Sequence, residues 1–433
     1  MSTTQTRSAR AKPDSAWFVH ERFGLFVHWG LYAVPARHEW VQNRERITEQ
    51  DYRRYFETFD PDLYDPEVWA REAHDAGMRY VVLTTKHHDG FCLWDSALTD
   101  YKAPDTPAGR DLVRPFVDAF RAAGMRIGFY HSLIDWDHPE FPVDGIHPMR
   151  DDAGFIEREK QRDIAVYRDY LHGQVRELLT GYGRIDVMWF DFSYTDRWWG
   201  GKGKEDWGSE ELMAMVRELQ PGIIVNDRLE VGGDLVTPEQ YQPARAPERD
   251  GEPVLWEACQ TLNGSWGYDR DNLDWKSPEM LVQMLVDTVS KGGNLLLNVG
   301  PTARGEFEPR ALDRLRAFHE WMRRHERSIR GCTASAHVPP PDCRYTQRGD
   351  RLYLHLFAWP FRHVHLEGLA GRVTAARLLS DGSEIAVSVI EPGQAGQNTT
   401  MAGMPPGTLT LELPIQPPPG VLVPVVELHL SEA

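Results

Sequence analysis

The sequence predicts a parallel α/β barrel of the (β/α)8, or TIM, type, followed by an antiparallel β-sandwich. Three observations carry this prediction. Short apolar runs alternate with helical segments through residues 1–335 of the 433-residue chain. Several of these runs end in polar side chains, as strands do at the C-terminal face of a barrel. Beyond that point, short alternating runs are separated by turn residues, which is typical of an antiparallel sandwich.

Each predicted barrel strand is a run of apolar, β-branched or aromatic residues with no polar alternate face, which favours burial on both sides. The clearest run, 80–85, passes directly into the Lys-His-His-Asp-Gly cluster at 86–90. The predicted strands are 23–28, 80–85, 126–130, 185–190, 223–226, 254–256 and 294–299. Because seven repeats are recognisable where a complete barrel has eight, domain 1–335 is predicted to be a barrel that allows for one distorted unit.

Helices are predicted between these strands at 66–74, 110–123, 152–179, 209–219 and 277–290. The first shows how such helices are recognised, because Asp65 is a suitable N-cap and Pro66 occupies the first turn. Glycines follow most of the predicted helices at the position where a left-handed C-cap is favoured.

Domain 336–433 is predicted to be the β-sandwich. The three prolines at 339–341 mark the change in composition, and 351–359 alternates as a half-buried strand does. Asp-Gly at 381–382 and Pro-Gly at 392–393 and 406–407 are turn signals between further strands.

Composition argues against several classes of partner. The formal net charge of −17 disfavours nucleic acid and anionic membrane surfaces. No run approaches the ~20 apolar residues that span a bilayer, and the polar segment 1–12 lacks the apolar core of a signal peptide. The four cysteines form no Cys-x-x-Cys pair, so we expect reduced thiols in a cytoplasmic protein. The sequence leaves a homo-oligomer open.

Polar side chains stand at the ends of at least five predicted strands. They are His28, the cluster at 86–90, the pair Tyr130 and His131, Asp191, Arg228 and Glu257. Because the C-terminal ends of barrel strands meet at one face, we expect these groups to converge. Buried polar groups need partners, so this convergence favours a functional site over isolated loop histidines and ordinary strand caps. The 15 tryptophans suit stacking on sugar rings, and a well-filled core would use them equally well.

Two chemistries are compatible with these residue types. Metal-assisted hydrolysis would use His28, His87, His88, Asp89 and Asp191, which include the ligand types of a zinc site. Against it, the first strand lacks a His-x-His spacing, and the rings of the adjacent His87 and His88 would point apart on an extended backbone. Glycoside hydrolysis would use a pair of carboxylates, with His, Arg and Trp side chains holding the sugar. It also explains the tryptophans, so we favour it and expect no metal.

The motifs resemble those of α-L-fucosidases, glycoside hydrolase family 29. In chain order they include Phe-Gly-Leu-Phe-Val-His-Trp-Gly at 23–30, the segment 86–96, Trp-Phe-Asp at 189–191, Asn-Asp-Arg at 226–228, Trp-Glu at 256–257, Ser-Trp-Gly-Tyr at 265–268 and the segment 292–301. The resemblance spans about 15–330 and implies a barrel with a C-terminal sandwich. It implies a retaining exo-hydrolase that releases L-fucose from fucosylated oligosaccharides or glycoconjugates through a covalent glycosyl-enzyme, without a cofactor. The alternatives are a hydrolase of a related α-L-glycoside, such as an α-L-galactoside or another 6-deoxy sugar, and a catalytically silent sugar-binding homologue.

The resemblance also implies roles for individual residues. Asp191 is the expected nucleophile, and Arg228 matches an arginine beside the general acid/base. The expected substrate-binding residues are His28, Glu39, Trp40, His87, His88, Tyr130, His131 and Trp266, the last against the C5 methyl of the sugar.

Three features remain open or depart from the family. The family commonly has Tyr-Tyr-Ser where this chain has Tyr-His-Ser at 130–132, so we expect His131 beside the nucleophile, with a changed pKa dependence. The general acid/base is Glu239 or Glu257, which suit different subgroups. We favour Glu239, because a loop position suits a proton donor that must reach a leaving group outside the fucose pocket. The segment 191–207 is either a wall for the leaving group or an ordinary βα loop.

Overall fold

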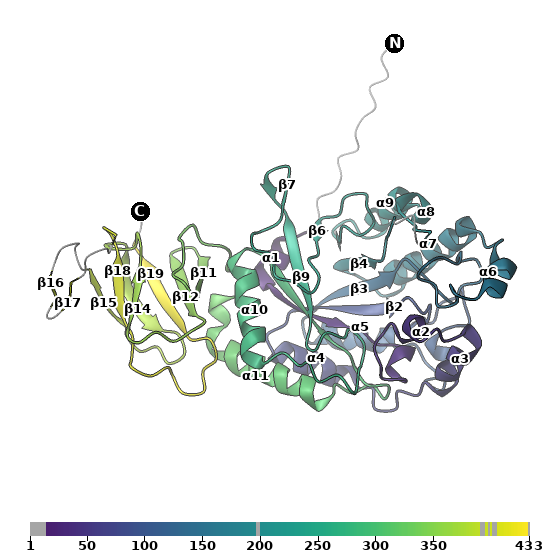
Figure 1. Ribbon diagram of the computed structural model, residues 1–433, viewed down its shortest axis with the longest axis horizontal. Helices are drawn as coiled ribbons and strands as arrows, with labels where there is room; N and C mark the ends of the chain where they lie inside the picture. Colours follow the sequence, from purple (N-terminus) through teal and green to yellow (C-terminus); the bar gives the residue numbers. More distant parts are fainter. Residues whose placement is uncertain (1–13, 196–199, 390–394, 397–398, 401–404, 432–433) are drawn as a thin grey trace, which may run out of the picture.

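The computed structural model describes residues 14–195, 200–389, 395–396, 399–400 and 405–431. A barrel of parallel strands is followed by antiparallel sheets that form a sandwich beside it (Figure 1). The predicted fold class is therefore confirmed. Among these residues, no helix has both the length and the apolar character needed to cross a membrane.

The barrel sheet has eight parallel strands in the order β5-β4-β3-β2-β1-β10-β9-β6. They are β1 (Phe23–Val27), β2 (Tyr80–Lys86), β3 (Arg126–Ser132), β4 (Val187–Asp191), β5 (Ile224–Val225), β6 (Leu235–Val236), β9 (Leu255–Thr261) and β10 (Asn294–Val299). A parallel bridge between Asn226 and Leu235 joins the two ends of the sheet and closes the barrel. The eighth strand, β6, was not predicted, because two residues carry too little hydrophobic pattern.

The distorted unit of the barrel lies between β5 and β9. A short loop joins β5 directly to β6, and the hairpin of β7 (Glu248–Arg249) and β8 (Glu252–Pro253) precedes β9. This hairpin projects from the barrel in Figure 1. In the other units a helix returns the chain from one strand to the next.

Most helices cover the outside of the barrel (Figure 1). They are α1 (Ala16–Glu21), α2 (Val41–Arg44), α3 (Glu49–Thr58), α4 (Pro66–Asp75), α5 (Val113–Ala122), α6 (Ala153–Glu159), α7 (Ile164–Gly181), α8 (Lys204–Trp207), α9 (Ser209–Leu219), α10 (Pro278–Ser290) and α11 (Pro309–His325). The single helix predicted over 152–179 is two helices, because the Asp163 side chain accepts a hydrogen bond from Ala165 N–H and caps the start of α7.

The interior of the barrel is closed at its N-terminal end by α1. The rings of Trp17 and Phe18 pack against Tyr80 at the start of β2, with centroid distances of 5.6 and 5.5 Å. Above them, Phe26 and Tyr130 pack on Trp189 at 5.3 and 5.9 Å. This layer of rings fills the barrel and forms the floor of a cavity at its C-terminal end.

The sandwich consists of the sheets β11-β12-β19-β14 and β13-β18-β15 and a small sheet of β16 and β17. Its strands are β11 (Cys343–Arg348), β12 (Arg351–Leu356), β13 (His363–Leu366), β14 (Val373–Leu378), β15 (Ala386–Val389), β16 (Ala395–Gly396), β17 (Thr399–Thr400), β18 (Leu409–Glu412) and β19 (Val425–Leu430). Arg344 of β11 forms an ion pair of 2.7 Å with Asp287 of α10, which attaches the sandwich to the barrel.

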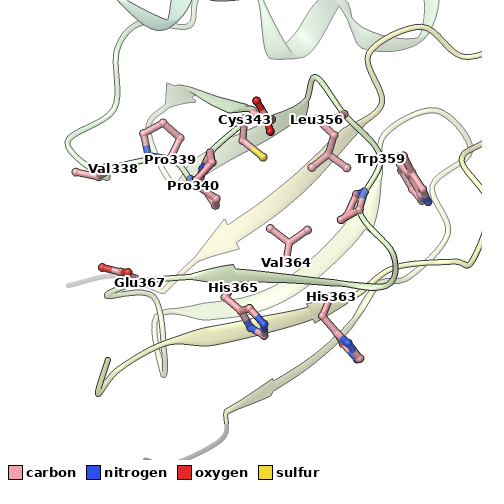
Figure 2. Close-up of a pocket in the computed structure, with 14 residues that line it drawn as sticks. Val338, Pro339, Pro340, Cys343, Leu356, Trp359, His363, Val364, His365 and Glu367 are labelled. Atoms are coloured by element: carbon pink, nitrogen blue, oxygen red, sulfur yellow. The ribbon is translucent and has the colours of Figure 1, made fainter. Parts of the chain in front are cut away.

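A hollow of ≈ 460 Å³ lies at one edge of the sandwich (Figure 2). Val364 of β13 points into it, and Pro339 and Pro340 lie on the opposite side. Most of its lining is apolar. The polar side chains predicted from the strand ends lie instead at the barrel.

Candidate active site

A cavity opens at the C-terminal ends of the barrel strands. It is lined by Phe26, His28, Trp40, His87, His88, Tyr130, Trp189, Asp191, Phe192, Arg228, Glu239 and Trp266. Its volume of ≈ 140 Å³ is well below the ~300–1,000 Å³ of pockets for drug-sized ligands, so it suits a group the size of one sugar ring. The structure thus brings together the predicted site residues except Glu39, His131 and Glu257.

Asp191 ends β4 and lies at the centre of the cavity's hydrogen-bond network. Arg228 Nη1 donates to its Oδ1 over 2.6 Å, and the Tyr130 hydroxyl donates to its Oδ2 over 2.7 Å. Burial by itself would raise the pKa of the Asp191 carboxyl, but the Arg228 charge, His88 and the Tyr130 hydrogen bond together hold it below its ordinary value. Asp191 therefore presents an ionised carboxylate to the cavity, as a nucleophile requires.

Glu239 lies on the loop after β6 and is linked to Asp191 by the same guanidinium. Arg228 Nη2 donates to Glu239 Oε2 over 2.7 Å, and Arg228 Cζ lies 4.5 Å from the centroid of the Trp189 ring. This cation–π contact and the two ion pairs fix the guanidinium. The Glu239 side chain is 40% exposed, against 13% for Asp191, so Glu239 lies at the mouth of the cavity.

Three imidazoles form one wall of the cavity. His28 follows β1, and His87 and His88 follow β2. Burial lowers the pKa of His28 to about 3 and that of His88 to about 4, and it holds the pKa of His87 well below its ordinary value. All three rings are therefore neutral near pH 7.

The expectation that His87 and His88 point apart is wrong. Their ring centroids are 4.0 Å apart, and both rings line the cavity. The reason is that β2 ends at Lys86, and the alternation of side chains does not extend beyond a strand. Even so, within the described ranges no group of three or more His, Cys, Asp or Glu side chains is placed to hold a metal ion.

Glu39 lies behind the cavity wall. Its Oε2 accepts hydrogen bonds from the backbone N–H groups of Gly267, over 2.8 Å, and Trp266, over 3.1 Å. Burial raises the pKa of the Glu39 carboxyl to about 7, although these two hydrogen bonds act in the opposite direction. Glu39 therefore holds the loop that carries Trp266, whose ring lies 5.1 Å from His28.

An ionised buried carboxylate and a second carboxyl at the mouth of a sugar-sized cavity are the groups that hydrolyse a glycosidic bond. The family model for α-L-fucosidase matches residues 1–327 of this chain. The chain belongs to the α-L-fucosidase family. This is glycoside hydrolase family 29, so the resemblance seen in the motifs is confirmed.

Solved structures and relatives of the α-L-fucosidase family are similar over most of the chain. α-L-fucosidase isoenzyme 1 from Paenibacillus thiaminolyticus is 49% identical, with a TM-score of 0.89 over 96% of this chain and 99% of that chain. A family 29 α-L-fucosidase from Bacteroides thetaiotaomicron, trapped as a covalent intermediate with 2-fluoro-fucosyl fluoride, is 27% identical, with a TM-score of 0.80 over 96% and 95%. The tissue α-L-fucosidase of Homo sapiens is 30% identical over 82% of this chain and 78% of its own length.

Three aromatic residues of this fucosidase-family site were not predicted to line it. Phe26 lies two residues before His28, and Trp189 lies two residues before Asp191. Since alternate residues of a strand share a face, counting back by two from each polar strand end would have found both. Phe192 follows β4 with a φ of +72°, a left-handed conformation that no sequence pattern here indicates.

The prediction that His131 lies beside the nucleophile is wrong. His131 is fully buried on the other side of β3, where its Nδ1 lies 3.1 Å from Thr85 Oγ1 and its ring lies 5.8 Å from Trp94. Adjacent residues of a strand face opposite sides, and it is Tyr130 that faces the cavity. The hydrogen bond to Asp191 therefore comes from Tyr130.

The alternative acid/base, Glu257, lies at the wrong end of the barrel. It is the third residue of β9 and pairs in register with Asn294, the first residue of β10. It is fully buried and accepts a hydrogen bond from the Tyr80 hydroxyl. The error arose because the predicted strand ended at residue 256, whereas β9 continues to Thr261. Glu239 remains the candidate that lines the cavity.

The loop that follows Asp191 is described in part. Residues 196–199 lie outside the described residues, so its role as a wall for the leaving group stays a prediction. Nearer the barrel, Tyr194 N–H donates to Lys202 O over 2.8 Å, and Lys202 pairs with the buried Asp144. These contacts fix the base of the loop.

Proposed function

We propose that this chain is a retaining exo-α-L-fucosidase that hydrolyses terminal α-L-fucosyl residues of oligosaccharides or glycoconjugates. The observation that carries the proposal is the Arg228 guanidinium, which binds Asp191 through one nitrogen and Glu239 through the other. One charged group thereby holds both carboxylates at the same sugar-sized cavity. The relative trapped as a covalent intermediate supports a double displacement.

In this mechanism Asp191 attacks the anomeric carbon while Glu239 gives its proton to the departing glycosidic oxygen. The bond to the leaving group breaks, and the sugar remains as an ester of Asp191. Glu239, now a carboxylate, then takes a proton from water, whose oxygen displaces Asp191. The Arg228 guanidinium and the Tyr130 hydroxyl stabilise the carboxylate that Asp191 becomes as it leaves.

The cavity supports recognition of a single terminal sugar. Neutral imidazoles on one wall suit the sugar hydroxyls, and the rings of Phe26 and Trp266 provide an apolar surface for a methyl group. Its small volume supports exo action on one residue. A cytoplasmic location is also proposed and is supported by the four cysteines, which are all buried free thiols. A homo-oligomer stays a prediction.

The test is a panel of an aryl α-L-fucoside, the matching α-L-galactoside and fucosylated oligosaccharides, each with and without EDTA. We expect the fucoside to be the best substrate, EDTA to have no effect, and proton NMR to show the α-anomer of L-fucose as the first product. A β-anomer as first product would contradict retention. Faster turnover of the galactoside would reassign the sugar, and loss of activity with EDTA would favour a metal-dependent hydrolase. A folded protein without turnover would favour the silent homologue.

A further inference from the structure

Two imidazoles of the cavity are each tied to a fixed partner behind the cavity wall. His88 Nδ1 lies 2.7 Å from Ser132 Oγ, and His28 Nδ1 lies 2.7 Å from Asn298 Oδ1. A neutral imidazole has one N–H donor and one acceptor nitrogen, and a fixed partner decides which nitrogen is which. We propose that Ser132 and Asn298 are positioning residues that hold both rings in the Nδ1–H tautomer, so that both Nε2 atoms accept hydrogen bonds from sugar hydroxyls. The inference rests on the proposed function for the identity of its ligand.

Ser132 can only accept a hydrogen bond from His88. Its own hydroxyl hydrogen goes to Ile134 O, 2.7 Å away, because a carbonyl oxygen cannot donate. Its oxygen also accepts from Ile134 N–H over 3.2 Å, which leaves one acceptor position for His88 Nδ1–H. The three bonds use the full capacity of a serine hydroxyl. The opposite tautomer would place two lone pairs against each other at 2.7 Å.

Asn298 imposes the same tautomer on His28 by a different route. Its Nδ2 donates to Trp266 O over 2.6 Å, again because the carbonyl oxygen can only accept. This contact orients the amide, so Oδ1 faces His28 and must receive a hydrogen from Nδ1. Asn298 is buried in β10, and the other amide orientation would lose the hydrogen bond to Trp266 O and set two carbonyl oxygens against each other at 2.6 Å.

The consequence is a cavity wall that accepts hydrogen bonds. His88 Nε2 lies 3.9 Å from Asp191 Oδ2, too far for a hydrogen bond. Within the described residues each of the two rings forms its hydrogen bond through Nδ1, which leaves both Nε2 atoms to a ligand. Such a wall selects ligand groups that donate, namely hydroxyls. A fluorine at the same position of the sugar cannot donate, and it would face a lone pair. The tautomer of each ring, in addition to its position, therefore determines the preference for a hydroxyl over a fluorine.

The tautomers can be measured directly, without turnover. Long-range proton–nitrogen NMR spectra of the ¹⁵N-histidine-labelled full chain distinguish protonated from unprotonated ring nitrogens, and the loss of signals in His28→Gln and His88→Gln assigns them. We expect both rings to carry the hydrogen on Nδ1 at pH 7. A hydrogen on Nε2 of either ring would overturn the proposal for that ring. Because this result needs no substrate, it stands apart from any failure of the proposed fucosidase activity.

The effect on specificity is tested by competitive inhibition with L-fucose and its 3- and 4-deoxy and 3- and 4-deoxyfluoro analogues. In the wild type, we expect fluorine to weaken binding as much as removal of the hydroxyl does, by about tenfold at the positions that the two rings contact. Ser132→Ala frees His88 to adopt the other tautomer, so the preference for the hydroxyl over fluorine should fall by about tenfold, and Ser132→Thr should restore it. Fluoro analogues that bind the wild type much better than deoxy analogues would overturn the proposal.

Thr85→Val is the matched control. Thr85 Oγ1 donates to Tyr130 O over 2.8 Å and lies 3.1 Å from His131 Nδ1, which is the same hydroxyl–imidazole contact outside the cavity. This variant should keep the wild-type preference for hydroxyl over fluorine even if its melting temperature falls. An equal loss of preference in Thr85→Val would show that the effect of Ser132→Ala is structural, and would overturn the role of Ser132.

Discussion

The two ends of the barrel interior carry the same pair of groups, a buried tyrosine that donates to a carboxylate. At the C-terminal end Tyr130 donates to Asp191, and at the N-terminal end Tyr80 donates to Glu257. The surroundings differ, because Arg228 contacts Asp191 beside an open cavity, whereas the rings of α1 close over Tyr80. The pKa of Asp191 is accordingly held below its ordinary value, while burial raises that of Glu257 to about 7. A cation and an opening therefore distinguish Asp191, the proposed nucleophile, from the buried acid Glu257.

Asp191 should be required for turnover. Asp191→Ala should lower kcat on an aryl α-L-fucoside by at least about 10⁴-fold, because no covalent intermediate can form. The matched control is Asp186→Asn, which alters a carboxylate that pairs with Arg126 at the other end of β4, 3.0 Å away. The control should keep activity close to wild type. Turnover by the Asp191→Ala variant at a wild-type rate would show that the nucleophile lies elsewhere.

Glu239 and Glu257 should also differ in their effect on turnover, because Glu239 lines the cavity and Glu257 does not. Glu239→Ala should lower kcat by about 10²–10⁴-fold on substrates whose leaving group needs a proton, and azide should restore turnover of an activated aryl fucoside. Glu257→Ala should unfold at a lower temperature and show no rescue by azide, since Glu257 lies beneath the floor of the cavity. Rescue of Glu257→Ala but not of Glu239→Ala would reverse the assignment.

Protonation of the cavity at the C-terminal end of the barrel should lower activity at acid pH. Burial lowers the pKa of His88 to about 4. The Asp191 charge acts in the opposite direction, and the Lys86 and Arg228 charges lower the pKa further. A proton on Nε2 removes an acceptor from the cavity, so the acidic limb of the kcat/KM profile should begin near pH 4 and fall by about tenfold per pH unit below it. Activity regained after return to pH 7 separates this effect from unfolding. A fall centred near pH 6.5 would contradict a buried, neutral His88.

The sequence predicted the features that depend on residue type and on the order of elements along the chain. It failed where the position of a side chain depends on the length of its strand. Apolar runs that end in polar residues placed Asp191 and Arg228 correctly. Asp191 is the last residue of β4 and Arg228 follows β5, and both strands end within one residue of the recognised run. Glu257 was misplaced because β9 continues for several residues beyond the recognised run. His131 was misplaced because the family resemblance compares residues one by one and does not show which of two neighbours faces the cavity. Tyr130 shares a face with Trp189 and Asp191 through the register of β3 against β4, which becomes visible only once the strands are paired.

The smallest expected effect belongs to Glu257→Gln, which keeps an acceptor for Tyr80. It should change kcat/KM less than about threefold, since Glu257 does not line the cavity. Its stability should differ more, and in a pH-dependent way. The folded wild type holds the Glu257 proton up to about pH 7, whereas the unfolded chain releases it near 4.5. Wild-type stability is therefore lost, through this group, as pH rises across that window, by at most about 3 kcal/mol.

The glutamine variant cannot ionise, so its melting temperature relative to wild type should increase from pH 4.5 to pH 7. Other buried acids, such as Glu39 and Asp89, contribute equally to both proteins and cancel in the difference. Parallel melting curves would mean that Glu257 is ionised in the folded protein. The pair Tyr80 and Glu257 would then carry the same charge as the pair Tyr130 and Asp191, and only the cavity would distinguish the two ends.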